Sequence, residues 1–257
     1  MGYNANRKKL TTIQKYNIEV FQSIDALNSA AAEYIIAVSK KAIAERGRFT
    51  IALSGGDTPQ ELYALLAKTP YNEQIEWKKT FVFWGDERWV PLDDRRNNAY
   101  QAKSILLDKV NIPASNIHRI SVNLSPNQAA IKYEKELRTF FGNELIQFDM
   151  ILLGLGDNGH TASLFPGTKV IHEHAEGIRF VEMNPPIGGR ITMTAALINR
   201  ARHILFLVTG EKKAGILGKV LDDSYQPNLY PAQLIKPTHG ELLWFADQEA
   251  ASLIKQF

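Results

Sequence analysis

The sequence has 257 residues, of which 45% are hydrophobic and 22% charged, as is typical of a globular protein and not of a disordered, fibrous or membrane-spanning chain. It contains no cysteine, which excludes disulfides, thiolate nucleophiles and cysteine-bound metals. A formal net charge of +3 is too small to indicate a nucleic-acid-binding face, and the N-terminal region lacks the apolar run of a signal peptide. We therefore expect a cytoplasmic protein that binds neither nucleic acid nor membrane, with residues 1–15 as a flexible tail.

Buried-strand patterns alternate with segments of helical periodicity along the chain. In chain order we predict a helix at 25–45, a strand at 49–53, a helix at 59–68, a strand at 81–84, helices at 98–107 and 128–141, strands at 148–153 and 203–208, and a helix at 211–221. This alternation indicates an α/β fold with a mainly parallel, Rossmann-like doubly wound sheet, helices on both faces and ligands beyond the carboxyl ends of the strands.

The chain shows neither an internal repeat nor a linker, so we expect residues 1–257 to form a single domain. The stretch 170–189 is the least regular part of the sequence. Within it, NPPIGG at 184–189 is expected to form an exposed turn or flap.

The segment SGGDTP, at 54–59, directly follows the first predicted strand. Thr58 is suited to N-cap the next helix and Pro59 to occupy its first turn. Two glycines let backbone N–H groups turn toward a ligand, and a helix N-terminus adds partial positive charge, so the segment could bind phosphate. A tight strand-to-helix turn that binds nothing explains the same residues equally well.

The segment WGDERWVP, at 84–91, follows the second predicted strand and precedes Asp94 and Asn97-Asn98. The planar guanidinium of Arg88 suits a phosphate or the oxygens of a sugar, and nearby carboxylates such as Asp86 can orient it or bind hydroxyls. The alternative is a surface ion pair next to a helix cap.

The segment GLGDNGH, at 154–160, spells G-x-G-x-x-G. A dinucleotide-binding fingerprint should open an uninterrupted helix, but Pro166-Gly167 follows within eight residues, which argues against a nicotinamide cofactor. His160 lies at the tip of a Gly-rich turn after an apolar strand and titrates near neutral pH, so it is a candidate general base. A structural histidine is the alternative.

Two further cations lie near turns. Arg190 follows Gly188-Gly189, and Lys213 follows the predicted strand at 203–208. Either could complete an anion-binding pocket or lie on the surface at the start of a helix, where a cation is slightly unfavourable. No histidine pair has the spacing of a helical zinc site, and we expect neither metal nor cofactor.

Taken together, these segments resemble the 6-phosphogluconolactonase family, a branch of the fold shared with glucosamine-6-phosphate deaminases and ribose-5-phosphate isomerases. The resemblance covers most of the chain in the family's order. It is carried by SGGDTP, WGDERWVPLDDRRNN, GLGDNGHTASLFPG, RITMTAALINRA and TGEKKA. It implies hydrolysis of 6-phospho-D-glucono-1,5-lactone in the oxidative pentose phosphate pathway, by a monomer or weak homodimer whose partner is a small sugar phosphate.

By this resemblance His160 is the general base that activates water. The implied substrate and phosphate contacts are Ser54, Gly55, Gly56, Thr58, Asp86, Arg88, Arg190 and Lys213. The family usually has aspartate where this chain has Asn158, and commonly Ser-Asn where this chain has Asn97-Asn98. An amide can orient the imidazole but cannot stabilise its charged form, so reduced activity is one hypothesis.

Two alternatives follow from the same residues. A glucosamine-6-phosphate deaminase-like isomerase would typically carry Asn-Glu-Pro after the histidine motif, whereas Phe165 precedes Pro166 here. Because of Asn158, the chain could also be a sugar-phosphate-binding protein that has lost turnover.

Overall fold

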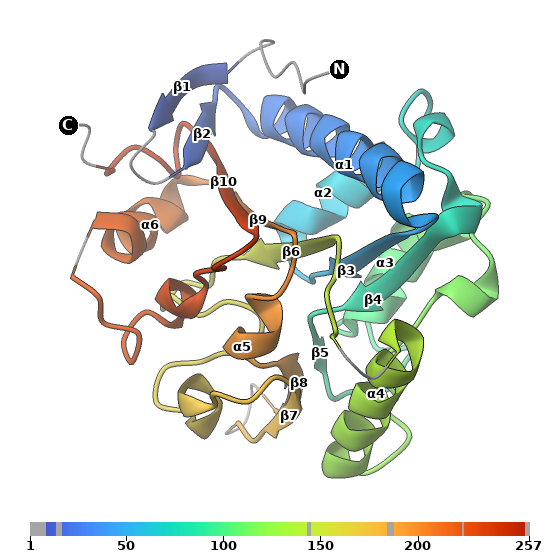
Figure 1. The fold of residues 1–257 in the computed structure, drawn as a ribbon. Coiled ribbons are helices and arrows are strands. Elements are labelled where there is room, and N and C mark those ends of the chain that lie inside the picture. Colours follow the sequence, from blue (N-terminus) through green and yellow to red (C-terminus); the bar gives the residue numbers. More distant parts are fainter. Residues whose placement is uncertain (1–8, 14–16, 143–144, 184–187, 223, 255–257) are drawn as a thin grey trace.

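The main sheet of the molecule is largely parallel. The computed structural model describes residues 9–13, 17–142, 145–183, 188–222 and 224–254. The strands of this sheet are β1 (Lys9–Ile13), β2 (Ile18–Phe21), β3 (Phe49–Leu53), β4 (Thr80–Trp84), β6 (Met150–Gly154), β9 (His203–Val208) and β10 (Glu241–Asp247). Their order is β1-β2-β10-β9-β6-β3-β4, and only β1 runs antiparallel to its neighbour (Figure 1).

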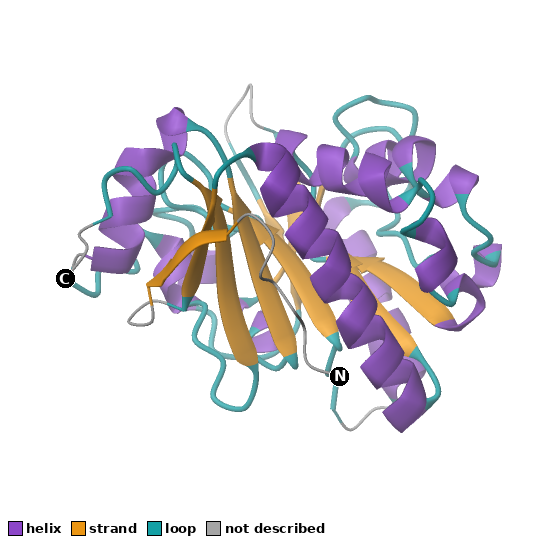
Figure 2. Ribbon diagram, turned by 90° about the horizontal axis from the view of Figure 1, so that it is seen from above, coloured by secondary structure: helices purple, strands orange, loops and turns teal. Residues whose placement is uncertain are grey.

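Helices cover both faces of this sheet (Figure 2). They are α1 (Ile24–Arg46), α2 (Asp57–Leu66), α3 (Asn98–Ile105), α4 (Pro126–Phe141), α5 (Ala195–Ile198) and α6 (Ala214–Asp222). The longest, α1, packs over β2, β3 and β10. The predicted α/β fold with a mainly parallel sheet and helices on both faces is therefore confirmed.

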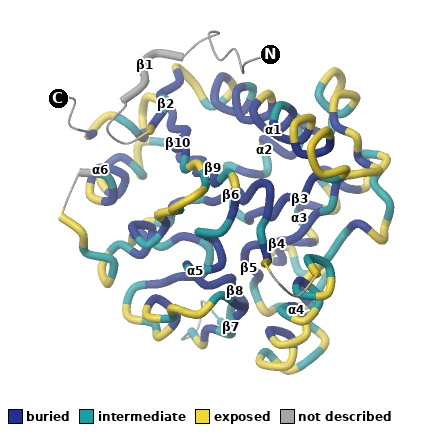
Figure 3. The backbone as a smooth tube through the Cα atoms, viewed as in Figure 1, coloured by how far each residue is buried: buried dark blue, intermediate teal, exposed yellow. Residues whose placement is uncertain are grey.

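The central strands are buried along almost their whole length (Figure 3). Every residue of β3 is buried, and so are the first four of β6. Because helices cover both faces, these strands have continuous apolar runs in the sequence and not an alternation of apolar and polar residues. That signal made the strands at 49–53, 81–84, 148–153 and 203–208 predictable.

A second, antiparallel sheet was not predicted. It consists of β5 (Asp86–Arg88), β8 (Arg190–Met193) and β7 (Ile178–Val181), in that order. Only Gly85 separates β5 from the end of β4, so this sheet starts at the carboxyl edge of the main sheet. Across β5 and β8, Arg88 pairs with Arg190.

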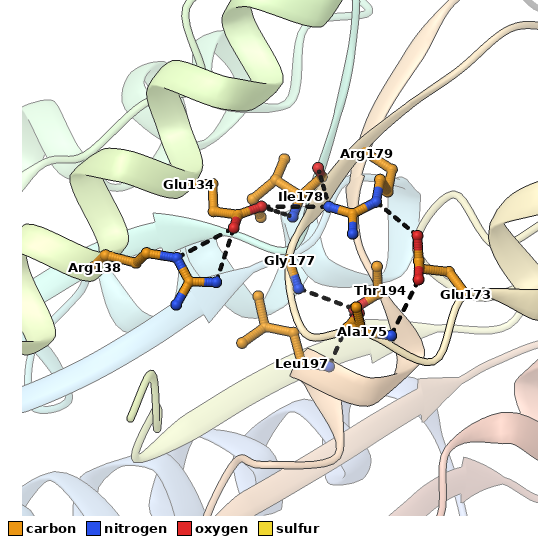
Figure 4. Close-up of polar contacts among 9 residues, drawn as sticks. All are labelled: Glu134, Arg138, Glu173, Ala175, Gly177, Ile178, Arg179, Thr194 and Leu197. Atoms are coloured by element: carbon orange, nitrogen blue, oxygen red, sulfur yellow. Dashed lines mark hydrogen bonds and ion pairs between the residues drawn. The ribbon is translucent and has the colours of Figure 1, made fainter. Parts of the chain in front are cut away.

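An ion-pair network holds this second sheet against α4 (Figure 4). One carboxylate oxygen of Glu134 accepts from the Arg138 guanidinium at 2.8 Å, and the other accepts from the Ile178 N–H at 3.0 Å and from Arg179 at 3.3 Å. Arg179 also donates to Glu173 at 2.9 Å. Partial burial raises the pKa of Glu134, but these hydrogen bonds and the arginine charges outweigh it and lower the pKa overall.

Some expectations need correction. Residues 9–13 form a strand of the sheet, whereas we expected a tail through residue 15; residues 1–8 and 14–16 lie outside the described residues. The stretch 170–189 is more regular than expected, since it contains β7. Most of the predicted NPPIGG flap, residues 184–187, also lies outside the described residues. Among the residues that are described, no helix is both long and apolar enough to cross a membrane.

We predict that Glu134→Gln lowers the free energy of unfolding by about 1–3 kcal/mol at pH 7, because it leaves partly buried donors without a carboxylate. The lowered pKa means that the contribution of Glu134 is complete above its unfolded-state pKa and is lost as the pH falls. The difference in the free energy of unfolding between the native protein and Glu134→Gln, measured by urea unfolding, should therefore become smaller in acid. Glu33→Gln, on the exposed surface of α1, is the control and should change stability by less than about 0.5 kcal/mol.

Candidate active site

A cleft of about 430 Å³ opens at the carboxyl edge of the main sheet. It is lined by the segments that follow β3, β4, β6 and β9, as expected for a parallel sheet whose strands all end at one edge. The predicted site residues that line it are Ser54, Gly55, Gly56, Thr58, Asp86, Arg88, His160 and Lys213. Arg190 and Asn158 are not among the lining residues, but Arg190 pairs with Arg88 and Asn158 is hydrogen-bonded to His160.

Two glycines of the segment after β3, Gly55 and Gly56, line the cleft. A Cβ on Gly55 would lie 1.9 Å from Oδ1 of Asn98, so this close approach requires glycine. Gly56 is the N-cap of α2, and Asp57 and Thr58 in its first turn line the cleft. The prediction that Thr58 caps the helix was wrong, because Thr58 lies inside the first turn. Its hydroxyl is hydrogen-bonded to the hydroxyl of Thr209 at 2.7 Å.

The two arginines come from the second sheet. Arg88 lines the cleft and donates to the backbone oxygen of Arg96 at 2.9 Å. Arg190 is half-buried on the neighbouring strand, and it donates to the backbone oxygen of Gly189 at 3.1 Å. Arg190 is the first residue of β8. It does not lie at the start of a helix, which the sequence had left open as an alternative.

Asp86 and Glu87, beside Arg88, are buried carboxylates. Asp86 accepts from the Ser163 hydroxyl at 2.6 Å, and burial raises its pKa despite this bond and the charges of Arg88 and Arg190. Glu87 accepts three backbone N–H groups, from Arg88 at 2.8 Å, Asn98 at 2.7 Å and Ala99 at 2.9 Å. Burial raises the pKa of Glu87 to about 8, although these bonds offset part of the effect.

Glu87 thereby joins β5 to the N-terminus of α3, where Asn97 caps the helix by accepting from the Tyr100 N–H at 2.9 Å. Asn98 then reaches back to donate to the Asp86 carbonyl at 3.0 Å and lines the cleft. The helix cap was part of the alternative interpretation of this segment, and the structure contains it. The sequence did not reveal that Glu87 and Asn98 shape the cleft.

His160 is held from three sides. Its Nδ1 lies 2.6 Å from Oδ1 of Asn158, and the His160 backbone N–H donates to the same oxygen at 3.3 Å. The Phe165 ring covers the imidazole at a centroid distance of 4.2 Å. On the remaining side Gly156 leaves room for the ring, since a Cβ there would lie 1.9 Å from Cε1. Because an amide oxygen only accepts, Nδ1 carries the proton and Nε2 is free to act as a base.

Burial and, to a smaller extent, the charges of Lys213, Arg190 and Arg88 lower the pKa of His160 to about 4, whereas Asp157 opposes them. The imidazole is therefore neutral at pH 7. A neutral imidazole can accept a proton, but a pKa this far below neutrality makes it a weaker base than one tuned to pH 7.

Lys213 ends a 3₁₀ turn, Glu211–Lys213, that follows β9 and precedes α6. The predicted helix at 211–221 therefore starts three residues late. The Lys213 ammonium donates to the carboxylate of Asp157, which lies in the loop after β6. Within the described ranges, no three histidine, aspartate or glutamate side chains are grouped as a metal site requires.

Comparisons with known proteins identify the family to which the chain belongs. The family model for glucosamine-6-phosphate isomerases/6-phosphogluconolactonase matches residues 22–244. A 6-phosphogluconolactonase from Synechocystis sp. is 46% identical over 220 residues, which cover 84% of this chain and 88% of that protein. One from Haemophilus influenzae is 42% identical, with coverage of 79% and 87%. The structure of a 6-phosphogluconolactonase from Trypanosoma cruzi superposes with a TM-score of 0.82 at 29% identity, covering 92% of this chain and 96% of that one.

Fold and cleft thus define a member of the superfamily that contains sugar-phosphate isomerases and lactonases. Within it, the chain belongs to the 6-phosphogluconolactonase family. The resemblance drawn from the five sequence motifs is confirmed.

We predict that Asn158→Asp raises the pKa of His160 by about 1–3 pH units, since a carboxylate at this position stabilises the imidazolium. Titration of the His160 imidazole by NMR should give about 4 in the native protein and a higher value in the variant. Asn123→Asp, on an exposed loop, adds the same charge elsewhere and should leave the titration unchanged. An equal His160 pKa in the native protein and in the Asn158→Asp variant would contradict the assigned hydrogen bond.

Proposed function

We propose that the cleft binds 6-phosphogluconolactone and hydrolyses it to 6-phosphogluconate, with His160 as the base that activates water. Membership of the 6-phosphogluconolactonase family supports the reaction and the substrate class. The observation that carries the mechanism is the hydrogen bond between Asn158 and Nδ1 of His160, because it fixes the tautomer that leaves Nε2 free.

The cations at and beside the cleft support binding of the 6-phosphate, although Asp57, Asp86 and Asp157 also line it. Arg88 and Lys213 line the cleft, and Arg190 lies beside Arg88 on the paired strand. The first turn of α2 adds the partial positive charge of a helix N-terminus. Holding the phosphate at a fixed place would position the distant lactone carbonyl for attack, so binding energy would be used for orientation.

In the proposed step, a water molecule beside Nε2 of His160 attacks C1 of the lactone and transfers a proton to the imidazole. A bond forms between the water oxygen and C1, and the ring C–O bond breaks when the tetrahedral intermediate collapses. The imidazolium then returns its proton to the departing ring oxygen. A δ-lactone is an activated ester, so the step needs neither a covalent intermediate nor a metal.

Asp86 keeps a second activity open. Deamination needs a carboxylate base for proton transfer at carbon, and Asp86 lies inside the cleft. Its burial disfavours an exposed, ionised base, although the hydrogen bond from Ser163 opposes this effect. Glucosamine 6-phosphate therefore serves as a second substrate in the assay, and we expect lactone hydrolysis to exceed ammonia release.

We predict that native protein accelerates loss of 6-phosphogluconolactone over the spontaneous reaction and that His160→Ala lowers kcat by about 10²–10⁴-fold. His172→Ala removes an exposed histidine and should retain native kcat. Binding of 6-phosphogluconate by His160→Ala should persist. If the native protein binds 6-phosphogluconate without accelerating hydrolysis, it is the sugar-phosphate-binding protein described above.

The pH dependence provides a separate test. The base must be neutral, so activity is lost as the pH falls through the pKa of His160, which is about 4 in the free protein. A bound phosphate offsets the cations that lower this pKa, so the acidic limb of kcat should lie at higher pH than the pKa of the free protein. In Asn158→Asp this limb should move higher again. The titration of the substrate phosphate is common to both proteins, which makes the difference between them specific for His160.

A further inference from the structure

Lys213 and Asp157 form an ion pair between two loops that end at the same cleft. Lys213 follows β9 and Asp157 follows β6, and these strands are neighbours in the main sheet. Both residues line the cleft. The Lys213 ammonium donates to Oδ1 of Asp157.

The two partners differ in how much of each side chain is exposed. The side chain of Asp157 is 85% exposed, whereas that of Lys213 is 26% exposed. Asp157 therefore loses little when it leaves Lys213, because water can solvate the freed carboxylate. Lys213 lines a cleft that also contains Arg88, so an anion beside its ammonium is favourable.

We propose that Asp157 is a displaceable stand-in for the substrate's anionic group: it pairs with Lys213 in the free protein and releases the ammonium when phosphate binds. The proposal rests on the proposed function for the identity of the substrate. Its physical content is a competition between one carboxylate of the protein and one anion of the ligand for the same ammonium.

This competition predicts the direction in which the affinity for an anion changes when the charge of Asp157 is removed. Each binding event must first break the bond between Asp157 and Lys213. The apparent affinity is therefore the intrinsic affinity multiplied by the fraction of molecules in which Lys213 is free. Breaking an exposed ion pair corresponds to a change of about two- to five-fold in affinity. If Asp157 instead held Lys213 in the position that phosphate needs, removing its charge would weaken binding.

The test uses isothermal titration calorimetry of the full chain with inorganic phosphate and with 6-phosphogluconate, at fixed ionic strength. Asp157→Asn should lower both dissociation constants about two- to five-fold, while Asp157→Glu, which keeps a competing carboxylate, should remain near the native values. Asp57→Asn is the matched control, because Asp57 is an exposed carboxylate of the same cleft. It should give a smaller effect.

A double-mutant cycle shows whether the gain acts through Lys213. In the Lys213→Met background, Asp157→Asn should no longer tighten binding. The proposal is overturned by an unchanged or higher dissociation constant in Asp157→Asn, by an equal gain in Asp57→Asn, or by a gain that persists without Lys213. These outcomes are separate from failure of the proposed function, which would appear as native protein that does not accelerate lactone hydrolysis.

Discussion

The gathering of three cations at and beside one cleft is the constraint on which the other features depend. Arg88 and Arg190 occupy paired positions on neighbouring strands, and Lys213 enters from the main sheet. Like charges held together in a partly buried site repel one another, and Asp86, close to both arginines, offsets part of that cost. Burial lowers the pKa of His160, and the same cations lower it further, so the imidazole is neutral. An anionic substrate bound beside these cations would favour proton transfer to the histidine.

The main sheet was predictable where strands are long and buried on both faces, as in β3 and β9. The strand β10 carries the same apolar signal and could have been predicted with them. The second sheet could not, because β5, β7 and β8 have only three or four residues each, too few for a period to be recognised. These strands depend on pairing and on the contacts of α4, which are properties of the fold and not of the local sequence.

The proposed site residues were predicted from the family motifs, and the structure brings most of them to one cleft. The residues that hold them in place were not. Glu87 is a buried carboxylate that binds backbone N–H groups, and Phe165 and Gly156 confine His160 from two sides. Such roles depend on which surfaces meet after folding. A glycine that must be small because an imidazole lies against it looks in sequence like any turn glycine.

The cleft is assembled from two sheets, and this division has a consequence for how substrate preference can change. The proposed base comes from the main sheet, whereas the two arginines come from the smaller one, whose position depends on Glu134 and Arg179 outside the cleft. In the proposed binding mode, the span between the lactone carbonyl and the arginines is therefore a property of how the sheets are joined. Substitutions at that junction would alter the length of ligand the enzyme accepts while every side chain that touches the ligand stays the same.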